Sequence, residues 1–353
     1  MRVVVVGASG NVGTAVLRAL VREPAVTSIV GVARRVPRAD GSSTVTFPHS
    51  AAEWVRVDLT DTQDAVVRGL DRAFLGADAV IHLAWAPPSA RNSARARRLN
   101  LGGTQAVVDA VVRGGVPHLV LGSTSGVYAP GPADGSPVDE EWPRRGVPTS
   151  SYSVQKVAAE RMLDQAAETH PSLVVTRVRP ALMLQREAGA ELARYFLGAL
   201  GTRALRLAAK RAPEGALLPV VPAPDGLRLQ VMHTDDAADA YRAVVVGRHP
   251  GPFNLAPEGW LTGDDLADLL AGGRKVAVSS TAARSGLSVA SRLHLAPIDV
   301  GWYDMARADV VLDASRAREL LHWAPEHDQG DVLRETVEGV LAGTGAGSPP
   351  LLG

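Results

Sequence analysis

The chain has 353 residues, enough for one large domain or two modest ones. Its 37 basic and 37 acidic residues balance, so charge gives no case for nucleic acid or a membrane surface as a partner. Cysteine is absent, which excludes disulfides and thiolate chemistry, and no apolar run approaches the roughly 18 residues of a membrane span. We therefore expect a soluble cytoplasmic protein without a metal site.

The N-terminus predicts a strand, a glycine turn and a helix. Val3 to Val6 read as a buried parallel strand, and a helix pattern runs to about Arg22. Glycines between the two permit a tight turn and close backbone approach, while the helix N-terminus attracts a pyrophosphate. The order predicts a dinucleotide site that includes Gly7, Ser9, Gly10, Asn11 and Val12.

The second strand pattern, 28–33, bears on which dinucleotide binds. An acidic residue at its end would accept hydrogen bonds from the ribose hydroxyls of NAD, but Ala33 stands there and Arg34 and Arg35 follow. Guanidinium groups suit a 2′-phosphate, so NADP is the expected cofactor, with NAD as the other possibility. The alternative for the two arginines is a solvated strand end.

Strands and helices continue to alternate through the first half of the chain, with strand patterns at 54–59, 78–85 and 118–125. This alternation predicts an α/β protein with a doubly wound parallel sheet, the Rossmann fold, whose ligands bind beyond the carboxyl ends of the strands. His82 is expected to be packed rather than to carry protons. The side chains at the strand ends are candidates for cofactor contact: Asp58, Leu59, Leu83, Ala84 and Trp85.

A tyrosine and a lysine four residues apart follow the fifth strand. Pro148, the potential cap Ser150 and the residues after Lys156 predict a helix that places Tyr152 and Lys156 on one face. An ammonium favours the phenolate, so a phenol with a reference pKa of about 10 would exchange protons nearer neutral pH. Taken alone, the pair also fits a solvated helix face. The hydroxyl groups of Ser123, Thr124 and Ser125 lie at the preceding strand end.

The second half of the chain predicts one more strand of the sheet, 173–180, and then a smaller lobe. We expect residues 1–180, joined by 227–256, to form the dinucleotide-binding domain, and 181–226 with 257–342 to form a C-terminal substrate-binding lobe. Residues 343–353 are expected to be a flexible tail. Within this half, helices are predicted at 188–210 and, capped by Thr234, at 235–246.

Several side chains are candidates for the substrate pocket. Arg186 would bind a substrate acid or lie on the surface, and Tyr195 fits a core position at least as well as a ligand contact. Asp235 and Asp236 fall in a helix first turn, where carboxylates favour the dipole, so they are predicted to be structural. The full set of pocket candidates is Trp85, Ser125, Gln185, Arg186, Tyr195, Trp302 and Tyr303.

These motifs, in this order, resemble the extended short-chain dehydrogenase/reductase family of the NAD-dependent epimerase/dehydratase type. The resemblance spans residues 3 to about 255. It rests on Gly7-x-x-Gly10-x-x-Gly13, Asp58-Leu59, His82-Leu-Ala84, Asn100 with Gly103-Thr104, Ser123-Thr124-Ser125-Gly-Val-Tyr128, Tyr152-x-x-x-Lys156, Arg179-Pro180 and His233-Thr-Asp235-Asp236.

The resemblance implies roles for these residues. Tyr152 would be the catalytic acid/base, and Lys156 would bind the nicotinamide ribose and lower the phenol pKa. Thr124 would bind the substrate oxygen, with Ser123 and Ser125 as fallback candidates. Asn100 and Pro180 would lie at the cofactor. A homodimer through the helices at 89–114 and 150–168 is also implied.

Three functions remain open from the sequence. The first is an NAD(P)-dependent oxidoreductase acting on a carbonyl or secondary alcohol of a small molecule. The second is an epimerase or dehydratase that oxidises a nucleotide sugar transiently and needs a basic set for its phosphates, for which Arg194, Arg203, Arg206, Lys210 and Arg211 are available. The third is a non-catalytic NADP-binding sensor, against which the Tyr152 and Lys156 pair argues.

Overall fold

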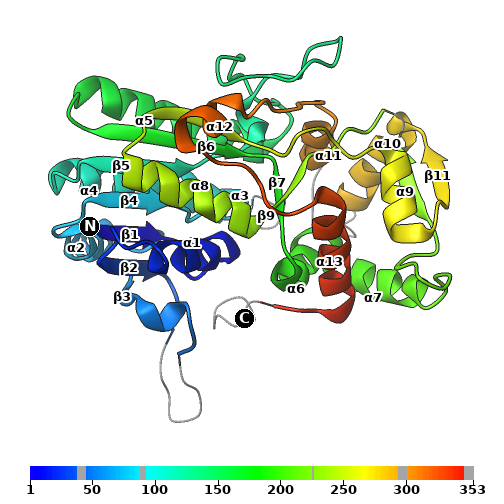
Figure 1. Cartoon of the computed structure of the whole chain (residues 1–353), viewed down its shortest axis with the longest axis horizontal. Coiled ribbons are helices and arrows are strands. Elements are labelled where there is room, and N and C mark those ends of the chain that lie inside the picture. The colour runs from blue at the N-terminus through cyan, green and yellow to red at the C-terminus, as the bar shows by residue number, and fades with distance from the viewer. Residues whose placement is uncertain (38–44, 88–92, 225, 293–299, 346–353) are drawn as a thin grey trace.

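The computed structural model describes residues 1–37, 45–87, 93–224, 226–292 and 300–345. A seven-stranded sheet runs through it in the order β10-β6-β5-β4-β1-β2-β3, with all neighbours parallel (Figure 1). The doubly wound Rossmann fold expected from the sequence is therefore confirmed. Its strands are β1 (Arg2–Val6), β2 (Ser28–Ala33), β3 (Glu53–Arg56), β4 (Ala79–His82), β5 (His118–Gly122), β6 (Val174–Pro180) and β10 (Gly251–Leu255).

Helices cover both faces of this sheet. Alternate residues of β1 enter two separate cores: Val3 and Val5 face one side, and Val4 and Val6 face the other. The first side is covered by α1 (Asn11–Val21), α8 (Thr234–Gly247) and α12 (Ser315–Leu321). The second side is covered by α2 (Gln63–Phe74), α4 (Gly103–Arg113) and α5 (Ser151–Thr169). The apolar run of β1 thus reflects burial on both faces.

The single helix predicted at 89–114 is interrupted. The structure has α3 (Ser93–Arg97), a π-helical turn η2 (Arg98–Gly102) and then α4, while residues 89–92 lie outside the described residues. Asn100 sits fully buried in the π turn, with its amide bonded to groups outside the helix. Such a π turn changes the direction of one side chain, here Asn100, and replaces regular i→i−4 backbone hydrogen bonds.

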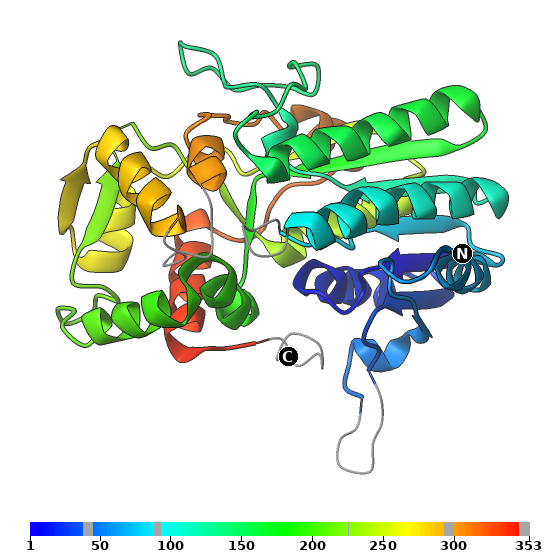
Figure 2. The same cartoon turned by 180° about the vertical axis from the view of Figure 1, so that it is seen from behind.

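A smaller lobe lies beside the sheet (Figure 2). Its core gathers Leu184, Val221, Val231, Leu270 and Leu333. Two small parallel pairs contribute, β7 (Leu182–Leu184) with β9 (Val231–His233) and β8 (Val221–Pro224) with β11 (Lys275–Val278). The lobe's helical segments are η4 (Arg186–Ala188), α6 (Gly189–Leu192), η5 (Ala193–Leu197), α7 (Gly198–Ala209), α9 (Gly263–Ala271), α10 (Ser280–Arg292), α11 (Val300–Ala306) and α13 (Gln329–Ala342).

Three details of the second half differ from expectation. The helix predicted at 188–210 breaks at Gly198, whose φ of 66° is left-handed. α12 packs on α8 and β10, so part of the range 257–342 belongs to the sheet's core rather than to the lobe. The expected tail is ordered at its start, because Ala190 N donates to Thr344 O over 2.8 Å. Residues 346–353 lie outside the described residues.

The cap of α8 also differs from the prediction. His233, not Thr234, is the N-cap, and its side chain accepts from Asp235 N. Asp236 is buried and accepts from the backbone N–H groups of Glu326 and His327, while Asp235 pairs with Arg18 at 2.6 Å. Both aspartates are structural, as predicted, but they join separate elements.

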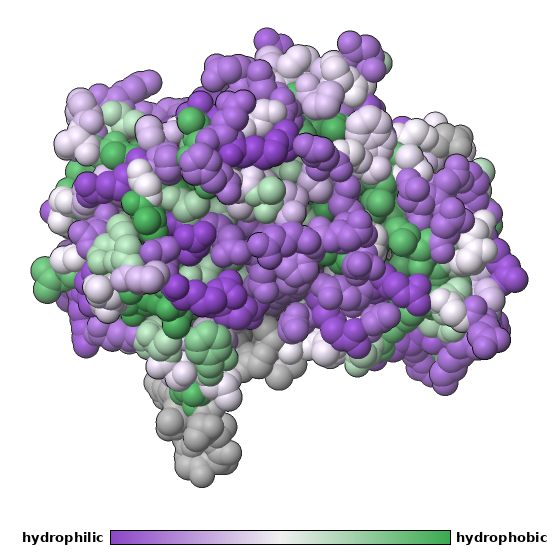
Figure 3. All heavy atoms as spheres, viewed as in Figure 1, coloured by the Kyte–Doolittle hydropathy of each residue, from purple (hydrophilic) through white to green (hydrophobic). Residues whose placement is uncertain are grey.

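The face seen in Figure 1 is mainly hydrophilic, interrupted by small separate apolar areas (Figure 3). Within the described residues no helix is both long enough and apolar enough to cross a membrane.

Candidate active site

The glycine turn after β1 has the shape that close ligand approach requires. Gly7 has φ 94°, and a Cβ there would lie 2.7 Å from Ala84 N. A Cβ on Gly13 would lie 2.3 Å from Gly7 O. The N-cap of α1 is Gly10, and no side chain caps the helix. Its first N–H groups are therefore available to an anion, as a dinucleotide pyrophosphate needs.

Polar groups gather at the neighbouring strand ends. Asp58 accepts from Thr60 N at 2.9 Å and from Thr60 Oγ1 at 2.7 Å. Partial burial raises the pKa of Asp58, but the Thr60 hydrogen bonds and the charge of Arg34 outweigh it and leave the pKa lowered. Arg34 and Arg35 lie exposed just after β2. They follow Val32, whose carbonyl accepts hydrogen bonds from Gly7 N and Ala8 N of the glycine turn.

The end of β4 is held by Asn100. The Asn100 Oδ1 accepts from Ala86 N, and Nδ2 donates to Ala86 O and to Gln155 Oε1, each at 2.8 Å. This amide is fully used within the protein, so Asn100 positions the segment that carries Trp85. The Trp85 indole N–H is buried without a hydrogen-bond partner among the described residues, which leaves a donor beside the glycine turn for a ligand.

His82 is a packed residue, as expected. Its Nε2 lies 3.0 Å from Thr104 Oγ1, and the side chain is buried. Burial and the charge of Lys156 lower the pKa of His82 to about 3, so it is neutral at physiological pH.

Thr124, Tyr152 and Lys156 come together at the ends of β5 and α5. Ser150 caps α5 by accepting from Ser153 N, as predicted, and the Thr124 hydroxyl lies near enough to the Tyr152 phenol to favour the phenolate. The Lys156 Nζ donates to Gly122 O at 2.6 Å and lies 3.8 Å from the centroid of the Trp85 ring. The same Nζ is 5.9 Å from the centroid of Tyr152.

The electrostatics of this pair contradict the expectation that Lys156 lowers the phenol pKa. Burial raises the pKa of Tyr152 to about 12, against the opposing hydrogen bond with Thr124. Burial also lowers the pKa of Lys156 to about 7, against the charge of Glu160. Both charged forms are disfavoured because both groups leave water. Tyr152 is therefore protonated at neutral pH.

A buried ion-pair network between β6 and α5 supports this site. Glu160 Oε2 receives Arg179 Nη2 at 2.7 Å and Arg144 Nη1 at 3.0 Å, and its Oε1 receives Ser123 Oγ at 2.5 Å. Arg179 also donates to Tyr128 Oη at 2.8 Å. Ser123 is thus committed to Glu160 and is not available as a fallback for Thr124. The sequence reasoning missed Glu160, although it follows Lys156 by one helical turn.

Aromatic rings enclose Tyr152. The Trp302 ring centroid lies 4.8 Å from that of Tyr152, and Trp85 meets the Tyr152 ring edge-on at 6.2 Å. Phe196, which the sequence analysis did not single out, packs on Trp302 at 5.3 Å. Of the predicted pocket residues, the structure therefore brings Trp85 and Trp302 to Tyr152.

The other predicted residues are placed differently. Arg186 pairs with Glu338 of α13 at 2.6 Å on the surface, so the structure gives it a partner other than a substrate acid. Tyr303 Oη donates to Ser280 O. Tyr195 interacts with Glu191 and Arg194. Gln185 is buried, and its Oε1 has no hydrogen-bond partner among the described residues.

The remaining cofactor and substrate candidates lie at the strand ends and turns around the site. Ser125 begins the 3₁₀ turn next to Thr124, and Val12 packs against the sheet's core. Leu59 packs against Gly103, and Leu83 N donates to Val6 O at 2.8 Å. Pro180 ends β6 beside Leu255. The side chain of Ser9 is largely buried within the glycine turn.

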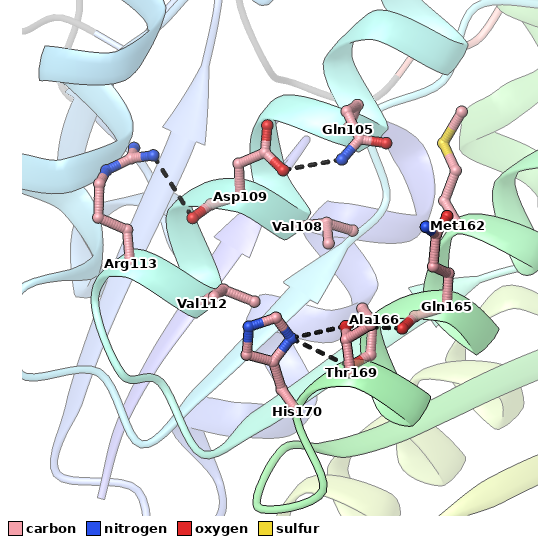
Figure 4. Close-up of a pocket in the computed structure, with 10 residues that line it drawn as sticks. All are labelled: Gln105, Val108, Asp109, Val112, Arg113, Met162, Gln165, Ala166, Thr169 and His170. Carbon is pink, nitrogen blue, oxygen red and sulfur yellow. Dashed lines mark hydrogen bonds between the residues drawn. The ribbon is translucent and has the colours of Figure 1, made fainter.

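Two surface depressions lie away from Tyr152. One, of about 300 Å³, separates α4 from α5 and is lined by Val108, Val112, Met162, Ala166 and polar neighbours, as Figure 4 shows. The other, of about 730 Å³, is lined only by lobe residues, among them Arg194, Arg203, Arg206 and Lys210. In the described part of the chain no group of three or more His, Asp or Glu side chains is arranged to hold a metal ion.

The fold and the glycine turn are those of a dinucleotide-binding α/β protein, and Tyr152 and Lys156 lie together at the end of β5. Residues 3–256 match the profile described as the NAD dependent epimerase/dehydratase family, and the chain belongs to that family. The resemblance deduced from the motifs is thereby confirmed.

Two relatives that are enzymes by name are similar to this chain in sequence. The chain is 28% identical over 227 residues to UDP-glucose 4-epimerase of Streptomyces lividans, covering 58% of this chain and 61% of the relative. It is 30% identical over 180 residues to L-arabinose 1-dehydrogenase (NAD(P)(+)) of Haloferax volcanii, covering 48% and 62%. The chain thus spans about three fifths of the length of these relatives.

The structural neighbours share the fold. A Thermus thermophilus UDP-glucose 4-epimerase in complex with NAD superposes with a TM-score of 0.65 at 20% identity, covering 96% of this chain and 99% of the other. DesIV, the dTDP-glucose 4,6-dehydratase of Streptomyces venezuelae with NAD and TYD bound, gives 0.67 at 21%, covering 96% of each chain.

Proposed function

We propose that the protein is an NAD(P)-dependent oxidoreductase that interconverts a carbonyl and a secondary alcohol, with Tyr152 as acid/base. The observation that carries this proposal is the convergence of Thr124, Tyr152 and Lys156 beside the glycine turn. The nearby donors and the uncapped α1 fit a dinucleotide, and this region's residues would hold it: Gly7, Ser9, Gly10, Asn11, Val12, Asp58, Leu59, Leu83, Ala84, Trp85, Lys156 and Pro180.

The bound nicotinamide would supply or accept the hydride. The chain's own part is positioning and proton transfer. Tyr152, protonated at neutral pH because burial raises its pKa to about 12, donates its proton to the substrate oxygen as the carbonyl is reduced. Thr124 Oγ1, which lies beside the phenol, orients that oxygen. Lys156, whose pKa burial lowers to about 7, can return a proton to the phenolate that remains.

The epimerase or dehydratase alternative draws support from the relatives, several of which act on nucleotide sugars by name. Such a substrate needs a basic set in the lobe for its phosphates, and four of the five candidate cations line the lobe depression. The Thr124, Tyr152 and Lys156 arrangement serves both reactions. We keep the simple oxidoreductase as the first proposal because it requires nothing beyond that arrangement and the cofactor. A non-catalytic sensor would not need the arrangement of Thr124, Tyr152 and Lys156, so we do not favour that alternative.

The test is Tyr152→Phe. Turnover should fall at least about a thousandfold, because general acid/base catalysis contributes roughly 10²–10⁴-fold and the phenol also binds the substrate oxygen. Cofactor affinity, measured by calorimetry, should stay within about threefold, because Lys156 and the glycine turn remain. Wild-type turnover by this variant would refute the mechanism. NAD(P) released on denaturing the purified protein would favour the epimerase alternative.

A further inference from the structure

The rings around Tyr152 form a continuous apolar wall, which we call the aromatic wall: Trp85, Phe196 and Trp302. Trp302 covers the Tyr152 ring at 4.8 Å between centroids with 34° between the ring planes, and Phe196 meets Trp302 at 82°. A substrate oxygen that reaches Tyr152 and Thr124 therefore brings the adjoining part of the substrate against these rings.

The wall is held in place by the packing of α11. A Cβ on Gly301 would lie 2.3 Å from Thr149 O, so α11 approaches the start of α5 more closely than any other residue would permit. Met305, one turn later, contacts Ser150 and would lie 2.7 Å from a Cβ on Gly126. α11 is therefore seated directly on the two segments that carry Tyr152 and Thr124.

Polar anchors fix the outer side of the same helix. Asp304 forms an ion pair with Arg284 at 2.7 Å, and Tyr303 Oη donates to Ser280 O at 3.1 Å, so both are bonded to α10. Trp302, between Gly301 and Tyr303, instead meets the Tyr152 ring. Five contacts of α11 thus determine the position of the indole over Tyr152.

We propose that the substrate presents a flat apolar ring next to its reacting carbon, and that Trp302 is the main residue selecting for it. This inference rests on the proposed oxidoreductase function. A ring stacked on an indole gains both apolar burial and favourable aromatic geometry. The Arg186 guanidinium, which the sequence suggested for a substrate acid, is already paired with Glu338.

The test compares two ketones that differ in the ring, 1-phenylpropan-2-one and hydroxyacetone, with NADPH and the full chain. In each turnover the carbonyl carbon gains a hydride, its oxygen gains a proton, and NADPH is oxidised. The aryl ketone should show at least about tenfold higher kcat/KM. Trp302→Ala should raise the KM for the aryl ketone and lower the ratio of its kcat/KM to that of hydroxyacetone by about tenfold, about 1.4 kcal/mol.

Two further variants make the result specific. Trp302→Phe keeps a flat ring and should restore most of the aryl-ketone KM. Trp260→Ala removes a tryptophan that is 39% exposed and packs on Arg228, outside the aromatic wall, and should change neither ketone. Thermal unfolding checks that each variant is folded.

Outcomes that overturn the inference differ from those that overturn the function. Three results would refute an aromatic substrate. The first is a preference for hydroxyacetone, and the second is turnover of UDP-glucose at a higher kcat/KM than the aryl ketone. The third is a folded Trp302→Ala whose KM for the aryl ketone is unchanged. If neither ketone is turned over, the affinity for 1-phenylpropan-2-ol, measured by calorimetry, tests the inference. An affinity about tenfold higher for wild type than for Trp302→Ala supports the inference, and equal affinities refute it.

Discussion

At the residue scale, Lys156 is unusual because an ammonium is placed where water is excluded. It is 4% exposed, and burial lowers its pKa to about 7, while Glu160 opposes that shift. In the unfolded chain the same lysine has an ordinary pKa near 10.4. Between these two values the unfolded state binds more protons than the folded state, so the stability of the fold rises with pH.

This linkage predicts the behaviour of Lys156→Met. Between pH 7 and pH 9.5 the wild-type free energy of unfolding should rise relative to Lys156→Met by about 1–3 kcal/mol, because each pH unit inside the window contributes up to about 1.4 kcal/mol. Urea unfolding at the two pH values measures it. Lys210→Met, at an exposed position, is the control and should track wild type. Parallel pH profiles for wild type and Lys156→Met would show that Lys156 is protonated in the fold throughout.

The arginines after β2 give the second prediction at this scale. Arg34→Ala with Arg35→Ala should weaken NADPH binding by at least about tenfold, because the two guanidinium groups would make charge-assisted bonds to a 2′-phosphate, and should leave NADH within about twofold. Paired calorimetric titrations measure both affinities. Equal losses for the two cofactors would remove the 2′-phosphate assignment.

At the scale of elements, the Arg179–Glu160 pair joins β6 to α5 with both side chains at most 2% exposed. Removing one partner of a buried pair leaves an uncompensated charge, which costs about 3–5 kcal/mol. The network therefore sets the height of α5 over the sheet and, with it, the position of Tyr152.

A double-mutant cycle tests this coupling. Arg179→Met and Glu160→Gln should each lower the free energy of unfolding by about 3 kcal/mol, and the double variant should lose clearly less than the sum. Urea unfolding supplies all four values. The exposed Arg113–Asp71 pair, 44% exposed on each side, is the matched control, and Arg113→Met should cost less than about 1 kcal/mol. If the losses in the free energy of unfolding at Arg179 and Glu160 simply add, the two side chains do not stabilise each other.

Elements differ in how far the sequence predicted them. The valines of β1 and the glycines after it are local signals, and both the strand and the turn were predicted correctly. The π turn at Asn100 depends on Ala86 and Gln155, which are distant in sequence, so periodicity could not reveal it. Trp302 was predicted as a pocket residue from its type alone. Its place over Tyr152 depends on how Gly301 packs against Thr149, a contact that no local pattern encodes.

At the scale of the whole molecule, the apolar depression between α4 and α5 is the surface that we propose for a homodimer. It mixes Val112 and Met162 with the hydrogen-bonded pair Gln105 and Asp109, the composition of a dimer interface with a polar rim (Figure 4). Met162 follows Tyr152 by about 15 Å along α5, so such contacts would brace the catalytic helix from outside.

Val112→Glu should convert the dimer to a monomer, because it places a charge in the interface at a cost of several kcal/mol. Sedimentation velocity measures the mass. Val246→Glu alters a residue of α8, on the opposite side of the sheet, that is 38% exposed, and should leave the dimer intact. A wild-type protein that sediments as a monomer at micromolar concentration would remove the proposal.

The strand order of the sheet has a consequence for biosynthesis. The chain leaves the sheet at Pro180, builds the first part of the lobe and returns only at Gly251 to pair with β6. On the ribosome the outer edge of β6 thus stays open while the intervening segment is made. An unpaired strand edge is a site for association with other chains. The nascent protein is therefore most vulnerable to aggregation in this interval, and translation speed between Pro180 and Gly251 should govern its soluble yield.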